Sequence, residues 1–539
     1  MDNPIIGTIW AFVPAIIAIV LALVTKQVYV SLFLGIFVGA MMYAGGEPLS
    51  ALVTLYNVMS AKVGGNVPIL VFLVVLGILV ILMQKSGGAK AYGDWAGRKI
   101  KSKKGALAAT AGLGCLIFVD DYFNCLTVGS VMRPVADKFK ISRAKLSYII
   151  DSTAAPVCII APISSWAAAV AGELQGDGLM VFISTIPFNV YALLTLVMVF
   201  AICFIKFDFG KMRKRDFYSD FTGDVFGGIT EGVEVGTEVK ANARGRVLDL
   251  LIPVIVLIAC CVGGMIYTGY FYNSDAGVIE YVARSSNVIE AFSNCDAGVS
   301  LAIGSTVALV IISIYYMARR VVSFKEVTGS FVDGFKAMVP AILILTFAWT
   351  ISGIMGAKGG YLDAQAFVQN NLANSNFPTF LFPVIFFILA GAIAFATGTS
   401  WGTFGVLVPI AVAILGGSGT LTIITVSATL GGAVFGDHVS PISDTTILAS
   451  AGAQCNHVDH VNTQLPYASL VAGIAAIAYL VAGACASLGG VVSGLIMWAV
   501  ALVVFVGAVF VIKLINKKKG PLSTEGFTKA EETEVKKQA

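Results

Sequence analysis

The stretch GDHVSPISDTT (436–446) interrupts the otherwise apolar run 421–449. Burying Asp437 and Asp444 in such a run is expensive unless another group compensates their charge, so a polar cluster here indicates a functional site inside a membrane. Pro441 lacks the N–H that a helix interior needs, and its ring clashes with the preceding turn. The stretch therefore predicts a membrane helix that is broken in its middle, with carboxylates and hydroxyls at the break.

The composition of the whole chain requires a membrane around such a helix. The 539 residues are 57% hydrophobic and only 12% charged, with a mean hydropathy of +0.88. Uncharged runs such as 180–205 and 491–512 exceed the roughly 20 residues that cross a hydrocarbon core of about 30 Å. The predicted fold class is an all-α polytopic membrane protein. Most of the nine cysteines lie in apolar runs and are expected to be buried small side chains.

We expect about eleven transmembrane helices and two shorter, re-entrant hairpins. The first half is expected to contain a hairpin at 105–132 and spans at 5–24, 28–44, 67–84, 146–171 and 180–205. The second half is expected to contain a hairpin at 379–416 and spans at 247–268, 298–317, 338–356, 421–449, 466–485 and 491–514. Two amphipathic stretches, 48–62 and 324–336, are expected to lie along the membrane surface.

Basic residues set the expected orientation. The first hairpin has basic flanks on both sides and is too short to cross the membrane twice, so it leaves and re-enters the cytoplasmic side. The second hairpin has no basic flanks and enters from outside. We therefore expect a multi-pass protein of the cell membrane with its N-terminus outside and its C-terminus cytoplasmic. This orientation places most Lys and Arg residues in cytoplasmic loops, at 85–104, 133–145, 206–246, 319–336 and 513–537.

The two halves repeat one unit. GSVMRPVA (129–136) aligns with FGVLVPIA (404–411), and APIS (161–164) aligns with SPIS (440–443). Because five spans and a hairpin precede the linker, the second copy starts from the opposite side, and such inverted repeats are typical of transporters. The predicted division is a first repeat at 1–206, a cytoplasmic linker at 207–246, an inverted second repeat at 247–515 and a cytoplasmic tail at 516–539.

Three further polar stretches interrupt apolar runs, as GDHVSPISDTT does. DDYFN (120–124) lies at the expected tip of the first hairpin, TGTSWGT (397–403) lies at the tip of the second, and DST (151–153) comes shortly before Pro156. A broken helix frees oxygens that can coordinate a desolvated cation, while half-helix N-termini offer N–H groups to an anion. We predict that the four interruptions enclose one site near the middle of the membrane.

The predicted site residues fall into three groups. Carboxylates are expected to hold a cation or a proton, since one desolvated carboxylate can carry either but not both. The foremost candidates are Asp437 and Asp444, followed by Asp151, Asp121 and Asp120. His438 is a candidate proton relay and the one histidine expected within the membrane. Hydroxyl and amide groups are expected to coordinate Na+ or substrate, namely Thr397, Thr399, Ser400, Thr403, Asn124, Ser152, Thr153, Ser440, Ser443 and Thr445.

Several of these residues have simpler roles as alternatives. Threonine and serine hydroxyls can bond to local carbonyls in a kinked helix. Asp444 can be the N-cap of the helix that follows the break, and the His438 imidazole can be satisfied by a neighbouring carboxylate. Asp120 and Asp121 are adjacent and cannot both ionise cheaply, so one of them is expected to face water or Arg133.

At these residues the chain resembles the NhaC family of sodium/proton antiporters. The resemblance rests on GDH (436–438) followed by SPISDTT (440–446), on ATGTSWGT (396–403) and on DSTAAPV (151–157). It covers most of the chain between about 65 and 450. It implies an ion-coupled transporter with Na+ at the helix breaks, and an elevator-like hairpin domain that moves against a fixed scaffold in a homodimer.

Two transport functions are consistent with these features. Na+/H+ antiport is favoured by the intramembrane carboxylates and by spans without Lys or Arg. The alternative is Na+-coupled transport of a small carboxylate or amino acid, by malate/lactate-like exchange or amino-acid symport, because half-helix ends can bind a carboxylate. We expect Na+, H+ and the lipid bilayer as partners, a small organic acid or amino acid under the alternative, no cofactor and no nucleic acid. No His-Glu-x-x-His motif indicates an enzyme.

Overall fold

The computed structural model describes most of the chain. The residues described are 5–25, 27–174, 178–205, 207–228, 242–273, 277–280, 285, 287–288, 291, 295–355, 361–364, 366–367, 378–416 and 419–518. They form helices and one antiparallel two-stranded ribbon, β1 (Tyr272–Asn273) with β2 (Val278–Ile279). The predicted tail beyond Lys518 and the linker stretch 229–241 lie outside the described residues.

Seven helices in the described part are long and apolar enough to cross a membrane. They are α4 (Val67–Ser86), α14 (Leu248–Phe271), α16 (Ala297–Ala318), α19 (Phe382–Thr397), α21 (Thr420–Val439), α23 (His457–Ala484) and α24 (Gly490–Lys518). These helices confirm the predicted all-α polytopic membrane fold.

Three bent helix pairs raise the number of candidate spans to ten if each pair is one span. The first pair is α2 (Val28–Tyr43) with α3 (Pro48–Gly65), bent by 117°. The second is α11 (Gly178–Thr185) and η2 (Ile186–Phe188) with α12 (Val190–Phe204), bent by 50°. The third consists of the two parts of α17 (Phe324–Met355), bent by 45°. The count of about eleven spans stays a prediction. The sharp turn into α3 is the geometry expected of a surface helix.

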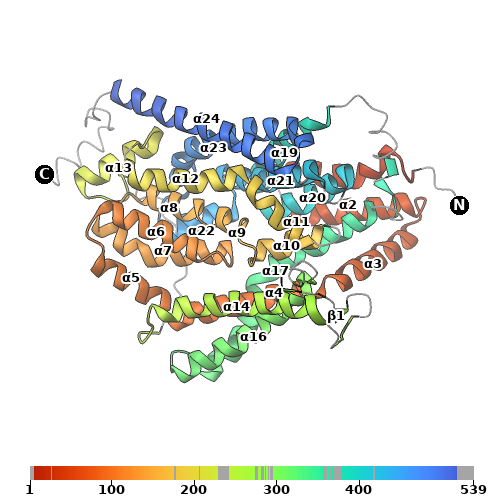
Figure 1. The fold of residues 1–539 in the computed structure, drawn as a ribbon, viewed down its shortest axis with the longest axis horizontal. Coiled ribbons are helices and arrows are strands. Elements are labelled where there is room, and N and C mark those ends of the chain that lie inside the picture. Colours follow the sequence, from red (N-terminus) through yellow and green to blue (C-terminus); the bar gives the residue numbers. More distant parts are fainter. Residues whose placement is uncertain are drawn as a thin grey trace.

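Both predicted hairpins are present as pairs of helices joined by a short break. The first consists of α6 (Lys103–Leu116) and α7 (Asp121–Lys138), and the second consists of α19 and α20 (Ser400–Leu415). Figure 1 shows α6 and α7 at the left of the molecule and α20 to the right of the short helices α9 (Ala155–Cys158) and α22 (Asp444–Ala453). The hairpins therefore lie towards opposite ends of the long axis.

Two predicted spans are broken helices. The span 146–171 consists of α8 (Arg143–Ser152), α9 (Ala155–Cys158) and α10 (Ser165–Glu173). The span 421–449 consists of α21 and α22 (Asp444–Ala453), with the break at Pro441 as predicted. The prediction that a span starts at 466 is wrong, because α23 begins at His457 and carries Pro466 in its interior.

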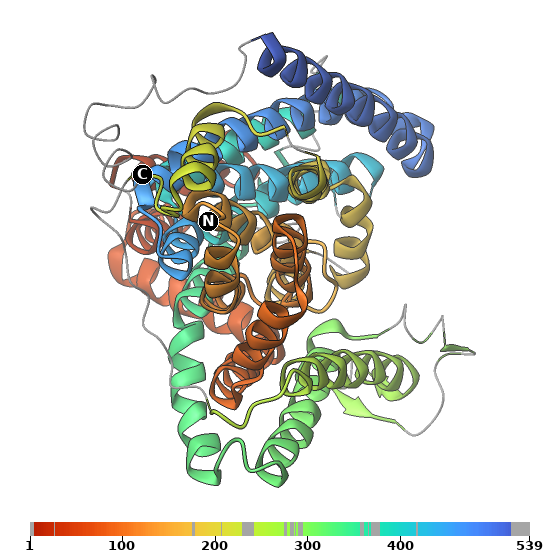
Figure 2. The ribbon, with the colours of Figure 1, turned by 90° about the vertical axis from the view of Figure 1, so that its left-hand side faces the viewer.

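Shorter helices complete the described chain. They are η1 (Ile9–Phe12), α1 (Val13–Thr25), α5 (Gly88–Lys99), α13 (Gly210–Thr222), η3 (Thr379–Leu381) and η4 (Ala486–Leu488). Most buried apolar side chains form one large cluster, and a smaller cluster joins α1, α2 and α3 to the end of α17. Figure 2 shows the light-green helices α14 and α16 at one edge, α24 at the opposite edge, and the hairpins between them.

Close packing of α19 on α21 positions the polar break. A Cβ atom at Gly436 would lie 2.2 Å from the carbonyl oxygen of Gly391, far inside van der Waals contact. Glycine at 436 therefore lets the two backbones approach. As a result Asp437, the next residue, comes within hydrogen-bonding distance of Ser400, which follows the end of α19.

Candidate functional site

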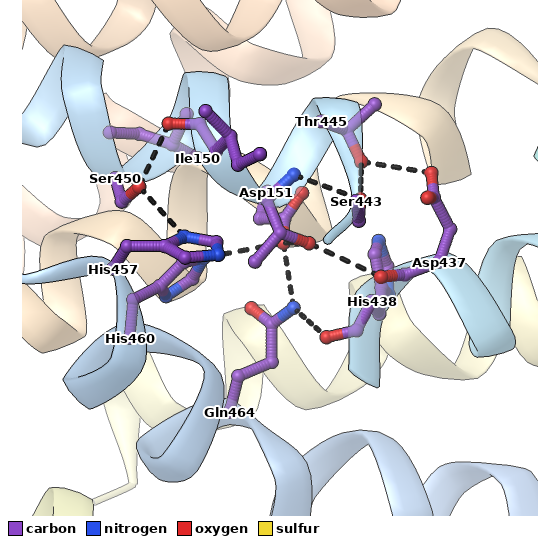
Figure 3. Close-up of polar contacts among 12 residues, drawn as sticks. Ile150, Asp151, Asp437, His438, Ser443, Thr445, Ser450, His457, His460 and Gln464 are labelled. Carbon is purple, nitrogen blue, oxygen red and sulfur yellow. Dashed lines mark hydrogen bonds and ion pairs between the residues drawn. The ribbon is translucent and has the colours of Figure 1, made fainter. Parts of the chain in front are cut away.

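Asp437 lies near the C-terminal end of α21 and is 1% exposed. Its Oδ2 atom accepts hydrogen bonds from Ser400 Oγ at 3.2 Å and from Thr445 Oγ1 at 2.9 Å. Its other oxygen, Oδ1, is buried and has no hydrogen-bond partner within the described residues. Figure 3 shows Thr445 reaching Asp437 from the first turn of α22. The carboxylate thus has one oxygen that hydroxyl groups surround and one that is unused.

Two helix N-termini bring these hydroxyls to Asp437. Ser400 is the first residue of α20, whose N-cap Thr399 accepts from the N–H of Gly402. Thr445 is in the first turn of α22, whose N-cap is Ser443. The Asp444 side chain is exposed and does not cap α22, so the N-cap alternative for Asp444 is wrong.

Asp151 forms a second buried centre at the end of α8. Its Oδ2 atom accepts from Gln464 Nε2 at 2.6 Å and from Thr446 Oγ1 at 3.2 Å. His460 Nε2 lies 3.3 Å from the same oxygen, and both Asp151 and His460 are 0% exposed. Asp151 Oδ1 is buried without a partner in the described part. Figure 3 shows Gln464 and His460 approaching Asp151 from α23.

Thr446 and Gln464 connect the two centres. Thr446 Oγ1 lies 3.2 Å from Asp151 Oδ2 and also 3.2 Å from the backbone carbonyl oxygen of Asp437. Gln464 Nε2 donates to Asp151 and, at 2.7 Å, to the carbonyl oxygen of His438. The His438 side chain is 1% exposed, and its Nδ1 atom lies 2.9 Å from the hydroxyl of Tyr191. The predicted α8 and α21 breaks therefore do meet.

The tip of the first hairpin is tied to the same region. Asn124 Nδ2 lies within hydrogen-bonding distance of the carbonyl oxygens of Gly114 at 2.7 Å, Ile117 at 2.9 Å and Thr153 at 3.0 Å. The amide thereby satisfies carbonyls that the ends of α6 and α8 leave free. In this structure Asn124 holds the hairpin tip against the α8 break.

Both carboxylates at the first tip are buried. Asp120 is 2% exposed and accepts from the N–H of Phe123 as the N-cap of α7. Asp121 is 0% exposed, and its Oδ2 atom accepts from the Trp166 indole N–H at 3.0 Å. The expectation that one of the two faces water is wrong, and its other form, that one faces Arg133, stays a prediction. Trp166 also packs against Trp401, with ring centroids 5.6 Å apart, so the two hairpins are in contact through it.

Four predicted coordinating hydroxyls donate to backbone carbonyls, three of them to a local carbonyl four residues earlier, as in the simpler alternative, and Ser440 to a carbonyl of α19. The acceptors are Ile393 for Thr397, Thr399 for Thr403, Ile149 for Thr153 and Phe395 for Ser440. The Ser152 hydroxyl is buried without a partner in the described residues. Their roles in ion coordination stay predictions.

Sequence reasoning missed His460 and Gln464. The predicted span begins at residue 466, whereas α23 begins at His457. The prediction therefore left His460 and Gln464 outside the membrane and His438 as the one histidine within it. One signal was available: His460 and Gln464 are four residues apart, so they share one face of a helix.

The stretch GTSWG (398–402) fits the Gly-x-Ser-x-Gly pattern of hydrolases. In those enzymes the pattern joins a strand to a helix, whereas here it joins two helices.

The sequence is similar to those of known proteins. A model of the Na+/H+ antiporter family matches residues 177–484. An uncharacterized protein of Haemophilus influenzae is 39% identical over 93% of this chain and 95% of its own. The malate-2H+/Na+-lactate antiporter of Bacillus subtilis is 34% identical over 30% of this chain and 33% of its own.

A solved structure has a similar fold. The YdaH transporter of Alcanivorax borkumensis superposes with a TM-score of 0.52 over 81% of this chain and 89% of its own, at 12% sequence identity. At that identity the likeness concerns the fold alone.

Proposed function

This chain belongs to the Na+/H+ antiporter family, and on that premise we propose that it exchanges Na+ for H+ with the Na+ held at Asp437. The membership confirms the resemblance found in its motifs. The protein is accordingly a multi-pass membrane transporter and not an enzyme.

The unused oxygen of Asp437 carries this proposal. A buried carboxylate oxygen without a partner is costly, and a desolvated cation would remove that cost. Ser400 and Thr445 can turn hydroxyl lone pairs towards a cation because a hydroxyl is both donor and acceptor. Carbonyls at the two helix breaks can complete the oxygen set. The proposed Na+ ligands are Asp437, Ser400 and Thr445.

Exchange follows from the burial of several carboxylates in one region. Asp437 and Asp151 are both buried, and each can be neutralised by a proton or by a cation. A Na+ ion that enters therefore disfavours a nearby proton, and a proton disfavours Na+. We retain Asp444, Asp120 and Asp121 as further proposed ion-binding groups beside these two.

Proteoliposomes with a trapped pH dye test the exchange. An inward Na+ gradient should drive protons out and raise the internal pH without any organic solute. Asp437→Asn should abolish the response. Asp333→Asn is the matched control, because this carboxylate is 51% exposed and pairs with Lys85, and it should leave the response intact. A wild-type protein that moves no protons under these conditions would contradict the proposal.

A second candidate function is Na+-coupled transport of a small carboxylate or amino acid. The partial similarity to the Bacillus subtilis antiporter favours it. The N-termini of α7, α10, α20 and α22 at the breaks support it too, since helix N-termini bind anions. A thermal-stability panel decides between the two: an organic acid that raises the unfolding temperature only with Na+ favours this candidate, and stabilisation by Na+ alone opposes it.

The arrangement in the membrane is also a proposal. We place the N-terminus outside and the C-terminus in the cytoplasm of a cell membrane, because the basic loops then face inward. We keep the division into repeats 1–206 and 247–515, joined by the linker 207–246. The hairpin-bearing domain would move against a scaffold that forms a homodimer, and transport would need no bound cofactor.

A further inference from the structure

We propose that Asp151 and His460 together form the proton-binding site of this transporter, separate from the Na+-binding carboxylate of Asp437. The inference rests on the proposed Na+/H+ exchange and adds which carboxylate carries the proton. It also brings in α23, which contributes none of the residues that the sequence motifs single out.

The groups around the two carboxylates differ in chemistry. Asp437 accepts from two hydroxyls, which can also act as cation ligands. Asp151 instead faces the amide N–H of Gln464 at 2.6 Å and a ring nitrogen of His460 at 3.3 Å. An amide N–H has no lone pair to offer and turns a positive edge towards the site, so it disfavours a cation there. Asp437 is thus better suited to Na+ than Asp151 is.

The Asp151–His460 pair has room for one proton. With a neutral imidazole the pair carries one negative charge, although both side chains are 0% exposed. Asp151 Oδ1 and His460 Nδ1 are both buried without a partner in the described chain. One added proton makes the pair neutral overall, whichever of the two residues holds it. Because burial of a net charge is expensive, protonation of this pair has a large effect on the energy of the site.

Thr446 gives the two sites a means of coupling. Its hydroxyl carries a single hydrogen but lies 3.2 Å from both Asp151 Oδ2 and the Asp437 carbonyl oxygen. It can donate to only one of them at a time. An anionic Asp151 attracts this hydrogen more strongly than a protonated one does. Protonation of Asp151 therefore changes the hydrogen bond from Thr446 to the backbone carbonyl of Asp437. A proton at Asp151 also repels a nearby Na+ directly.

The other ionisable groups near the pair come from several helices. Among the described residues His438 is a competing base: its Nδ1 lies beside the Tyr191 hydroxyl, but its Nε2 is buried without a partner there, so the variants below test it separately. Asp459 in the first turn of α23 pairs with Arg215 of α13. Asp151 interacts electrostatically with ionisable groups on three other helices, namely His438 and Asp437 of α21, Cys125 of α7 and Tyr191 of α12.

Proton release on Na+ binding tests the assignment. The purified protein in detergent would be titrated with Na+ in weak buffer containing a pH dye, and Na+ affinity would be measured by thermal stabilisation at several pH values. In the wild type, Na+ should release protons, and the half-saturating Na+ concentration should rise about tenfold per pH unit below the pKa of the proton site.

The variants separate the two sites. His460→Gln and Asp151→Asn should still be stabilised by Na+, which shows that they fold, but they should release no protons and should lose most of the pH dependence. Asp437→Asn should lose stabilisation by Na+. His457→Gln, the same change three residues earlier on α23, is the control and should behave like the wild type. His438→Gln tests the competing base, and it should still release protons on Na+ binding.

Proton release by both His460→Gln and Asp151→Asn at the wild-type level would overturn the assignment while leaving Na+/H+ exchange intact. Loss of release in His438→Gln alone would likewise move the proton to His438 and overturn it. A wild-type protein that Na+ stabilises without any proton release would overturn the exchange itself, and this site with it.

Discussion

The backbone N–H of Asp444 donates to the carbonyl oxygen of Gly398, with the two atoms 3.2 Å apart. Gly398 ends α19 at the tip of the second hairpin, and Asp444 begins α22 after the break in α21. The bond therefore joins a hairpin tip directly to a broken helix. Ser400 and Thr445, which both donate to Asp437, lie within two residues of this bond.

Gly398→Ala should damage this junction. Gly398 has a φ of +70°, where side chains other than hydrogen are strained, and an added Cβ would lie 2.3 Å from the carbonyl oxygen of Ile442. Strain of this kind costs roughly 1–3 kcal/mol, and the contact with Ile442 adds to it. We expect a lower unfolding temperature in detergent and weaker Na+ binding.

Gly223→Ala is the matched control for that substitution. Gly223 also ends a helix in the left-handed conformation, with a φ of +81°, but an added Cβ there meets only the end of the Lys140 side chain, at 3.7 Å, which is an ordinary contact. It should therefore show the backbone strain without the contact. Equal losses of stability in the two variants would show that the junction with Ile442 has no special weight.

Asn124→Asp should destabilise the first hairpin by about 3 kcal/mol or more. The substitution keeps the side-chain volume but replaces an N–H donor with an acceptor that faces the carbonyls of Gly114, Ile117 and Thr153. Buried carbonyls then lose their donor and meet a carboxyl group. Asn462 on α23 is half-buried and makes a solvent-exposed bond to the carbonyl of Val458 in its own helix, so Asn462→Asp should change stability by only a few tenths of that amount. Denaturant or thermal unfolding of both variants measures the difference.

Local chemistry made much of the fold predictable. Pro441 disfavours a continuous helix where it adjoins a run of polar residues, and Gly398 permits the left-handed turn that ends α19, so both breaks could be placed from the sequence. The alternation of apolar runs with polar interruptions likewise predicted both hairpins. These features depend on residues within one or two turns of the chain.

The partners of Asp151 could not be predicted in the same way. His460 and Gln464 lie in a polar stretch ahead of Pro466, which resembles a loop by composition, yet tertiary packing buries them. The direction of a hydroxyl is equally hidden. Thr397 and Thr445 have the same side chain, but one donates to Ile393 in its own helix and the other to Asp437. Threonine has two accessible rotamers in a helix, and neighbours from other helices decide between them.

Removal of one hydroxyl from Asp437 should weaken Na+ binding without destroying the fold. Thr445→Val deletes the donor at 2.9 Å from Asp437 Oδ2, whereas Thr445→Ser keeps it. A hydrogen bond or ligand of this kind is worth about 1–1.5 kcal/mol, which is roughly a tenfold change in affinity. The Na+ concentration for half-maximal exchange in proteoliposomes should rise about tenfold for Thr445→Val and little for Thr445→Ser. Similar values for the two variants would argue against Thr445 as a Na+ ligand.

A buried ion cluster ties the linker helix α13 to the start of α8. Lys145 is 3% exposed, and its Nζ lies 2.7 Å from Asp208 Oδ2 and 2.9 Å from Asp216 Oδ2. Lys103 lies 3.1 Å from Asp216 Oδ1. Burial alone would raise the pKa of Asp216, but the charges of Lys145 and Lys103 outweigh it and hold that pKa below its usual value.

This lowered pKa predicts how stability depends on pH. The folded protein binds a proton at Asp216 less readily than the unfolded chain does, so the stabilisation is fully present above the unfolded pKa of about 4 and is lost as the pH falls through the folded pKa. The unfolding temperature of the wild type should therefore drop below about pH 4. Asp216→Asn should cost roughly 3 kcal/mol at neutral pH, because Lys145 loses a buried partner, and should show a smaller drop in acid. Asp220→Asn, which removes a 54% exposed partner of Lys103, is the control and should keep the wild-type profile. Unfolding curves of Asp216→Asn and the wild type that run parallel down to pH 3 would contradict the role of this cluster.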